Sequence, residues 1–177
     1  MKRIYLIGYM GSGKTTLGKA FACAAGMQFI DLDWYIEERM HRTIRELFAE
    51  RGESSFREVE RNMLYEVGEF ENVVIAAGGG TPCFFDNIAY MNRTGDTVFL
   101  NASPEALFRR LKVAKAKRPL LADKTDEELM GFIKDGLAGR MAFYSQAKYH
   151  FDSSLLEDRR QIGESVERLR TMLEEKS

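Results

Sequence analysis

The residues of this chain with the clearest chemical meaning lie near its N-terminus. Residues 8–15 read GYMGSGKT, which places three spaced glycines, a lysine and a threonine hydroxyl directly after an apolar run. Glycines at such a turn let backbone N–H groups converge on phosphate oxygens, and the following helix N-terminus adds partial positive charge. Lys14 can reach the outer phosphates, and the Thr15 hydroxyl can bind Mg²⁺. This spacing predicts a nucleoside triphosphate site rather than a ligand-free glycine turn.

A second chemical signal follows the next apolar run, where Asp31 and Asp33 flank Leu32. Near a triphosphate, one carboxylate can hold Mg²⁺ directly or through water, and the other can accept the proton of a substrate hydroxyl. The alternative is a structural role, because Asp33 opens an apparent helix, where a carboxylate is favoured as N-cap. One aspartate could serve both purposes.

Two further groups suggest where an acceptor molecule binds. Arg57 and Glu60 are three residues apart and share one face of a predicted helix. There Arg57 could hold a substrate carboxylate with two parallel hydrogen bonds, or the two side chains could form an ordinary solvated pair. Glycines 78–80 end a buried run. Such a triplet is useful where a ligand must approach the backbone closely, with a plain loop as the alternative.

The elements that must position these residues alternate between apolar runs and amphipathic segments, which is typical of an α/β domain. Strands are predicted at 2–7, 28–31, 72–77, 96–101 and 149–152, and helices at 14–25, 34–40, 43–50, 55–69, 104–111, 126–147 and 162–173. Strands separated by helices imply parallel pairing, with ligands at the carboxyl ends of the strands. We expect a single domain over residues 1–177, with the Lys- and Arg-rich segment 112–124 as a mobile cationic loop.

Composition excludes several other classes of protein. Lys and Arg number 26 and Asp and Glu 27, a net charge of −1, which argues against a general nucleic-acid binder. No apolar run approaches the ~18 residues that a membrane span needs. Cys23 and Cys83 lack metal-ligand spacing, and isolated His41 and His150 argue against a zinc site or a catalytic triad. We expect a cytoplasmic protein with no nucleic-acid or membrane partner.

With these motifs together, the chain resembles the shikimate kinases, a family of small P-loop kinases. The resemblance runs from Lys2 to about Asp152. Its motifs are the phosphate loop, FIDLD at 29–33, GESSFREVE at 52–60, the glycine triplet and RPLL at 118–121. The phosphate loop alone is shared by a large superfamily, whereas the whole set in this order is highly specific. The resemblance implies a three-layer P-loop NTPase fold like that of the nucleoside monophosphate kinases, with a five-stranded parallel sheet flanked by helices. It also implies a substrate-binding helical region at about 33–61 and a short lid at about 112–124.

The resemblance also implies a role for each matched position. Asp33 would contact the shikimate hydroxyls and assist the attacking one, while Arg57 and Arg140 would hold the carboxylate. Gly79 and Gly80 would line the ring. Catalytic roles would fall to Asp33, Lys14 and Arg118, the last being the arginine of the lid. One Mg²⁺ ion would be held by Thr15 and Asp31. ATP would be bound by Gly11, Ser12, Gly13, Lys14, Thr15, Thr16 and Arg118.

The implied reaction transfers the γ-phosphoryl group of MgATP to the 3-hydroxyl of shikimate, giving shikimate 3-phosphate and ADP. It would serve chorismate and aromatic amino-acid biosynthesis, in a monomer. Three features depart from the family pattern. Leu32 replaces the more usual threonine or serine, a change that we expect to matter little. Ala77 stands where a threonine commonly precedes the glycines, which removes a hydroxyl contact to water or Mg²⁺. Residues 140–144, RMAFY, match R-x-P-L-Y only in part.

Two other functions compete with this interpretation. One is a gluconate or nucleoside monophosphate kinase of the same fold, which Arg57 and the glycine triplet disfavour. The other is a regulatory GTPase or a nonenzymatic ATP sensor. The sequence has no N-K-x-D motif for reading guanine, and it keeps both Asp33 and Arg57.

Overall fold

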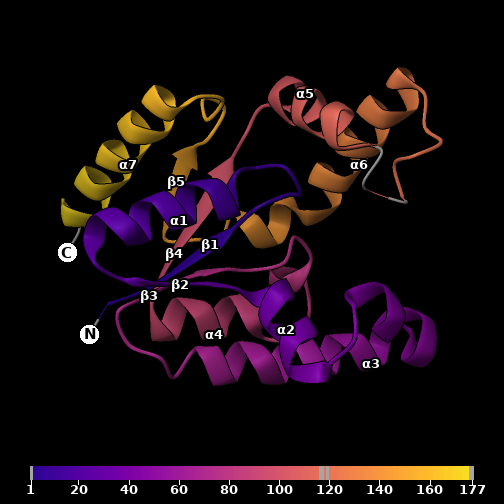
Figure 1. Ribbon diagram of the computed structural model, residues 1–177, viewed down its shortest axis with the longest axis horizontal. Coiled ribbons are helices and arrows are strands. Elements are labelled where there is room, and N and C mark those ends of the chain that lie inside the picture. The colour runs from indigo at the N-terminus through magenta and orange to yellow at the C-terminus, as the bar shows by residue number, and fades with distance from the viewer. Residues whose placement is uncertain (1, 116–117, 119, 176–177) are drawn as a thin grey trace.

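A five-stranded parallel sheet, in the order β2-β3-β1-β4-β5, forms the centre of the molecule (Figure 1). The structure is a computed structural model, and it describes residues 2–115, 118 and 120–175. Every neighbouring pair of strands is parallel, as the alternation of strands and helices predicted. The strands are β1 (Arg3–Ile7), β2 (Gln28–Asp31), β3 (Val73–Ala76), β4 (Asp96–Asn101) and β5 (Tyr149–Asp152).

Helices cover both faces of this sheet and complete three layers (Figure 1). The alternation of side chains along a strand assigns the two faces. Ile4 and Leu6 of β1 belong to the apolar cluster with α1 (Lys14–Ala25) and α7 (Arg159–Glu174). Tyr5 and Ile7 belong to the other cluster. That second cluster includes side chains of α2 (Leu32–Met40), α3 (Ile44–Val67), α4 (Asn87–Thr94), α5 (Pro104–Ala114) and α6 (Asp126–Tyr144).

The strand order brings the chemically interesting segments together. β3 lies between β2 and β1, so the carboxyl ends of these three strands are adjacent. Asp31 ends β2, the glycine triplet follows β3, and residues 8–15 follow β1. Beyond these ends, α5 and α6 form one side of an opening, and α2 and the start of α3 form the other (Figure 1).

Some helices differ from those predicted. The predicted segments at 43–50 and 55–69 form the single helix α3, interrupted at Gly52, where φ is 75° and ψ is 172°. Because glycine adopts such a conformation without a steric penalty, the chain kinks there and continues as helix. α4 was not predicted, and a short 3₁₀ turn at Thr81–Cys83 precedes it. α6 ends at Tyr144 rather than 147.

The predicted loop at 112–124 begins later than expected. α5 continues to Ala114, so the first three residues of that segment are helical. Leu111 is buried in the core and anchors this last turn. Lys117 and Pro119, which belong to the predicted lid and to the RPLL motif, lie outside the described residues. Among the residues that the structure describes, no helix is both long and apolar enough to span a membrane.

Candidate active site

The loop between β1 and α1 has the shape of an anion site. Gly11 and Gly13 adopt φ values of 80° and 98°, in the left-handed region that favours glycine. Gly13 is the N-cap of α1 and supplies no side-chain oxygen to the N–H groups of the first turn. Those donors and the positive end of the helix dipole are suited to a phosphate group. The loop borders a cavity of about 500 Å³.

Lys14 folds back over this loop. Its Nζ donates to the carbonyl oxygen of Gly8 at 2.7 Å and to that of Tyr9 at 3.0 Å. Burial lowers the pKa of Lys14 to about 8, although the nearby carboxylates of Asp33 and Asp31 act in the opposite direction. The amine therefore remains mostly charged at neutral pH, beside the N-terminus of α1.

Asp31 links β2, α1 and α2 through its two carboxylate oxygens. Oδ2 accepts a hydrogen bond of 2.9 Å from the Thr15 hydroxyl, and Oδ1 accepts one of 3.2 Å from the Trp34 backbone N–H. The N-cap of α2 is therefore Asp31, and the helix-cap alternative considered for Asp33 is wrong. Asp33 lies in the first turn of α2 instead and lines the cavity.

The surroundings of Asp33 favour its protonated form. The side chain of Asp33 is exposed toward the cavity that it lines. Desolvation by the protein atoms around it, with the nearby charges of Glu60 and Asp31, raises the pKa of Asp33 to about 6, while Lys14 acts to lower it. A carboxylate with such a pKa is ionised at neutral pH, yet it is a stronger base than an ordinary aspartate.

The oxygens of Thr15 and Asp31 suit Mg²⁺, which prefers oxygen ligands and is commonly held by one or two carboxylates together with substrate phosphates. Within the described ranges, no group of three or more His, Cys, Asp or Glu side chains could hold a metal ion. The donor set therefore fits an ion that shares its ligands with a nucleotide.

Arg57 and Glu60 are not a solvated surface pair. Arg57 Nη1 lies 2.9 Å from Glu60 Oε1, and the two side chains are 12% and 1% exposed. The other oxygen of Glu60 accepts a hydrogen bond of 2.8 Å from the Thr81 hydroxyl. Glu53, more than half exposed, makes a longer contact of 3.4 Å with Arg57 Nη2. The firm partner of Arg57 is thus the buried carboxylate.

The glycine triplet explains how the predicted substrate residues fit together. A Cβ at Gly78 would lie 2.9 Å from Asp33 Oδ1, and one at Gly80 would lie 2.7 Å from Arg57 Nη2. A Cβ at Gly79 would lie 3.0 Å from Arg140 Nη1. Each glycine therefore lets the backbone approach one functional side chain. The turn brings together residues from α2, α3 and α6.

The partly matched motif at 140–144 keeps the two residues that contact this region. The hydroxyl of fully buried Tyr144 donates to the carbonyl oxygen of Gly79 at 2.6 Å, and its ring stacks on Phe99. The guanidinium of Arg140 lies 5.3 Å from the centroid of the Tyr9 ring. Of the two substituted positions between them, Ala142 is exposed and Phe143 is half-buried.

The remaining predicted residues divide between the cavity wall and its surroundings. Ser12, which is part of the phosphate loop, is buried. Arg118 is exposed at the edge of the cavity. Ala77 also contributes to the wall, with a methyl group where the family commonly has a hydroxyl. Other predicted residues in the wall are Gly11, Gly13, Thr15, Thr16 and Gly79.

Sequence reasoning missed Arg110, which also lines the cavity. Its side chain is 14% exposed and pairs with Glu157 at 3.0 Å. Nη1 donates to the carbonyl of Gly11 at 3.1 Å and Nη2 to that of Ser153 at 2.8 Å. It thereby ties α5 to the phosphate loop and to the segment after β5. In sequence it is one of two adjacent arginines on an amphipathic helix, and no spacing distinguishes it.

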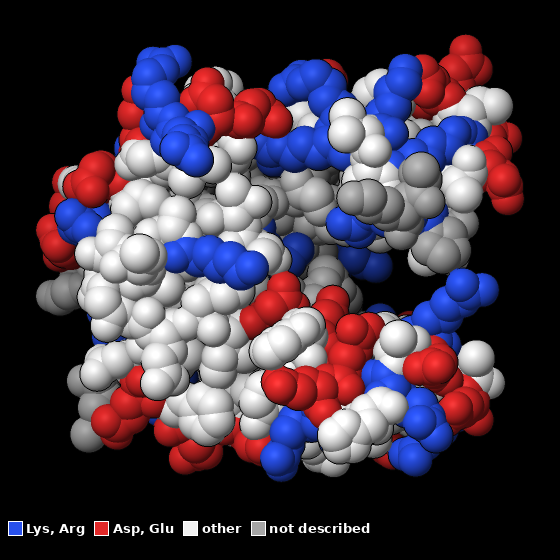
Figure 2. Space-filling view, viewed as in Figure 1, with Lys and Arg blue, Asp and Glu red and all other residues white. Residues whose placement is uncertain are grey.

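Trp34, also missed, stands at the rim of the cleft. Its side chain is 62% exposed, and with Thr15, Lys19, Phe29 and Asp31 it lines a second hollow of about 350 Å³. Figure 2 shows the opening from outside, with acidic side chains gathered below it over α2 and α3 and basic ones above it over α5.

Comparison with known proteins agrees with this geometry. The family model described as shikimate kinase matches residues 10–170. Curated shikimate kinases of Bacteroides thetaiotaomicron and Phocaeicola vulgatus are each 64% identical to this chain, covering 98% of it and 99% of the relative.

Solved structures confirm the predicted fold. The structure of shikimate kinase from Bacteroides thetaiotaomicron matches with a TM-score of 0.95 at 64% identity over 98% of both chains. That of shikimate kinase from Acinetobacter baumannii in complex with shikimate has a TM-score of 0.84 at 30% identity, covering 99% of this chain and 95% of the other. The P-loop fold, the motifs and the relatives together show that the chain belongs to the shikimate kinase family, a family of ATP-dependent kinases.

Proposed function

We propose that the chain transfers the γ-phosphoryl group of ATP to the 3-hydroxyl of shikimate, giving shikimate 3-phosphate and ADP. The observation that carries this proposal is the meeting of Asp33, Arg57 and Arg140 around the glycine turn, in continuity with the phosphate loop. Shikimate carries hydroxyls and one carboxylate on a single ring. An acceptor site with one basic carboxylate and two guanidinium groups matches that chemistry.

Phosphoryl transfer asks the protein mainly to align the reactants and to stabilise negative charge. Asp33 orients the attacking hydroxyl and accepts its proton, since its carboxylate is ionised at neutral pH and more basic than usual. Lys14 and Arg118 supply positive charge to the transferring group. Mg²⁺ bound with ATP neutralises phosphate charge, and Thr15 and Asp31 would hold it.

Two arginines hold the acceptor through its carboxylate. Arg57, fixed by Glu60, and Arg140, next to Gly79, bind the shikimate carboxylate. Gly79 and Gly80 lie against the ring, where a side chain would occupy the space the substrate needs. These contacts place the 3-hydroxyl between Asp33 and the γ-phosphate.

The segment at about 112–124 acts as a lid in this proposal. Its closure brings Arg118 over ATP, excludes water and thereby limits hydrolysis of ATP without an acceptor. The enzyme works as a cytoplasmic monomer that supplies chorismate and aromatic amino-acid biosynthesis. Light scattering at assay concentration tests the monomer, which predicts a mass near 20.3 kDa.

The test of the reaction is ADP release from MgATP with shikimate, gluconate, AMP, CMP or no acceptor. We expect release only with shikimate. Turnover with gluconate or a nucleotide instead would keep the phosphate-loop assignment and reject the acceptor. ATP binding without turnover on any acceptor would indicate a nonenzymatic ATP-binding module.

The test of the acceptor end is Arg57→Ala. It should raise the KM for shikimate far more than the KM for ATP, because the lost contact is to the shikimate carboxylate alone. An equal rise in both constants would contradict the assignment of Arg57.

A further inference from the structure

The segment that follows the glycine triplet lies along α3 through two adjacent aromatic side chains. The ring centroid of Phe84 is 4.0 Å from Cζ of Arg57, and that of Phe85 is 5.1 Å from Cζ of Arg61. Arg57 and Arg61 are four residues apart and so occupy one face of the helix. The rings of two adjacent residues therefore cover two arginines that lie one helical turn apart.

This arrangement requires an unusual backbone. Side chains of adjacent residues in an extended chain point to opposite sides, and Phe84 is extended, with φ −120° and ψ 147°. Phe85 follows with φ 49°, a left-handed conformation that is strained for an aromatic residue. Such strain persists only where the surrounding contacts compensate for it.

The contacts that compensate join the segment to α3 at several points. Thr81 donates to Glu60, as described. Asp86 forms an ion pair of 3.0 Å with Arg61 Nη2 and accepts a hydrogen bond of 3.1 Å from the Tyr65 hydroxyl. Phe84 is half-buried between these points, whereas Phe85 is 52% exposed. Phe84 is thus the more enclosed ring of the two, and Phe85 faces solvent.

Arg57 needs such support because its hydrogen bonds restrain it incompletely. Nη1 has the strong contact with Glu60, and Nη2 has only the long one with exposed Glu53. Its Nε is buried and has no hydrogen-bond partner among the described residues. A planar guanidinium held firmly at one nitrogen can still rotate, and an aromatic ring against its face opposes that motion. The Phe84 ring is closer to it than those of Phe56 and Phe48, at 5.3 and 5.9 Å.

We propose that Phe84 is a positioning residue for substrate binding. Its ring fixes the face of the Arg57 guanidinium and keeps water from it, so that the remaining N–H groups of Arg57 are presented to the substrate carboxylate. This inference rests on the proposed function, specifically on Arg57 as a carboxylate ligand. Phe85 makes the equivalent contact with Arg61, to which the proposed function assigns no contact with the substrate, and it provides a matched control.

The experiment compares Phe84→Leu, Phe84→Tyr and Phe85→Leu with the wild type, varying shikimate at saturating MgATP. Phe84→Leu should raise the KM for shikimate about fivefold or more, the effect expected for losing a partly buried cation–π contact. The KM for ATP and kcat should change less than about twofold, because neither depends on the contact. Phe84→Tyr, which keeps the aromatic face, should restore the wild-type KM, and Phe85→Leu should leave it unchanged.

A general loss of structure would have a different signature. It would lower the concentration of active enzyme and affect kcat, and Phe84→Leu and Phe85→Leu would behave alike. An unchanged KM in Phe84→Leu, or equal increases in both leucine variants, would overturn the proposal. If Phe84→Leu does not fold, Phe84→Met offers an unbranched, flexible apolar side chain without the aromatic face and is judged by the same criteria.

A double-mutant comparison separates this inference from the function on which it rests. In an Arg57→Ala background, Phe84→Leu should cause no further loss of kcat/KM for shikimate, because its effect passes through Arg57. A further fivefold loss would overturn the positioning role. Wild-type enzyme without shikimate-dependent ADP release would overturn the proposed function and this inference together. Normal wild-type turnover with an unaffected Phe84→Leu would overturn this inference alone.

Discussion

At the scale of single residues, the cleft shifts the two groups that matter most for charge in opposite directions. Burial raises the pKa of Asp33 to about 6 and lowers the pKa of Lys14 to about 8. Both residues carry their charge together only between these values. We therefore expect activity to be highest in a window around neutral pH. Asp33 should set the acid limb of the pH profile and Lys14 the alkaline limb.

The pH dependence of kcat/KM follows from these two groups. Below pH 6 Asp33 gains a proton and can no longer accept one, so kcat/KM for shikimate should fall about tenfold per pH unit. Above pH 8 Lys14 loses its charge, so kcat/KM for ATP should fall. Asp33→Asn should lower kcat roughly 100-fold or more and remove the acid limb. A wild-type profile that stays flat down to pH 5 would contradict this role of Asp33.

The ionised carboxylate of Asp33 should lower the free energy of unfolding at neutral pH, compared with an uncharged side chain at the same position. Because the pKa of Asp33 is higher in the folded chain than the ordinary value of 3.8, folding favours its protonated form. Its contribution to stability is therefore complete below pH 4 and is lost as the pH rises through 6. Asp33→Asn should raise the free energy of unfolding at pH 7.5 and change it little at pH 4, measured by urea denaturation. If Asp33→Asn changed the free energy of unfolding equally at both pH values, the result would argue against a raised pKa of Asp33 in the folded protein.

At the scale of elements, the glycine turn after β3 organises the acceptor site, because α2, α3 and α6 all bring side chains against it. The sequence was sufficient to predict this convergence in outline, since the carboxyl ends of parallel strands meet at one edge. It did not reveal the partner of each glycine, because that depends on where three separate helices pack.

Gly80→Ala tests how closely the turn and α3 must fit. The added methyl would lie 2.7 Å from Arg57 Nη2, so the guanidinium has to move. Losing one charge-assisted contact to the substrate carboxylate should raise the KM for shikimate about tenfold. Gly131→Ala in α6 is the control, because its methyl would meet nothing within 4 Å. Shikimate KM values that are the same for both variants would contradict the proposed geometry.

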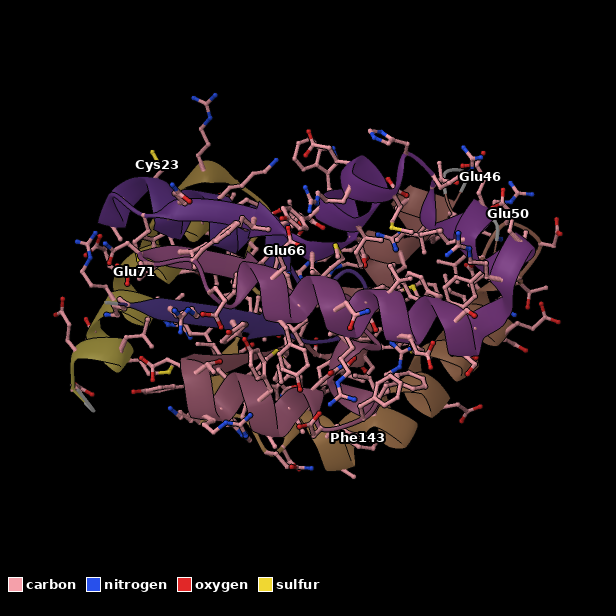
Figure 3. All side chains as sticks on the ribbon, turned by 90° about the horizontal axis from the view of Figure 1, so that it is seen from below. Cys23, Glu46, Glu50, Glu66, Glu71 and Phe143 are labelled. Atoms are coloured by element: carbon pink, nitrogen blue, oxygen red, sulfur yellow. The ribbon has the colours of Figure 1, made fainter. Side chains whose placement is uncertain are left out.

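The strands were predicted well and some helix features were not, for identifiable physical reasons. Buried runs such as Val73–Ala76 are apolar without interruption, which is a strong signal. The kink at Gly52 divides one helix into halves that resemble two, and Figure 3 shows Glu46 and Glu50 on its outer half, away from Glu66. Asp31 caps α2 through a bond to Trp34 that only the local turn defines. The short helix α4 follows strained Phe85, and no periodicity marks it beforehand.

At the scale of the whole molecule, the nucleotide and acceptor sites depend on different parts of the fold. The face of the sheet covered by α1 and α7 has one apolar cluster, while the acceptor residues come from helices on the opposite face, whose cluster also includes Tyr9 of the phosphate loop. The Asp31–Thr15 hydrogen bond and the contact of Arg110 with Gly11 connect the elements around the cleft.

Metal binding should depend on the nucleotide, because the described residues supply few ligands for the ion. The described residues offer a hydroxyl and a carboxylate for Mg²⁺ at Thr15 and Asp31, and no protein cage. Equilibrium dialysis should show weak Mg²⁺ binding to the protein alone and stoichiometric retention with ATP, and EDTA should abolish ADP release reversibly. Tight retention of Mg²⁺ without nucleotide would mean that the protein supplies ligands of its own.

The position of Trp34 has an optical consequence. It is the single tryptophan of the chain, and its largely exposed indole stands next to Thr15 and Asp31. All indole emission of the protein therefore originates at the corner of the cleft where a metal-bound triphosphate would lie. Water, charge and polarity there set the colour and intensity of that emission. The chain thus contains its own fluorescent reporter for the arrival of nucleotide, with no label to attach and no second tryptophan to subtract.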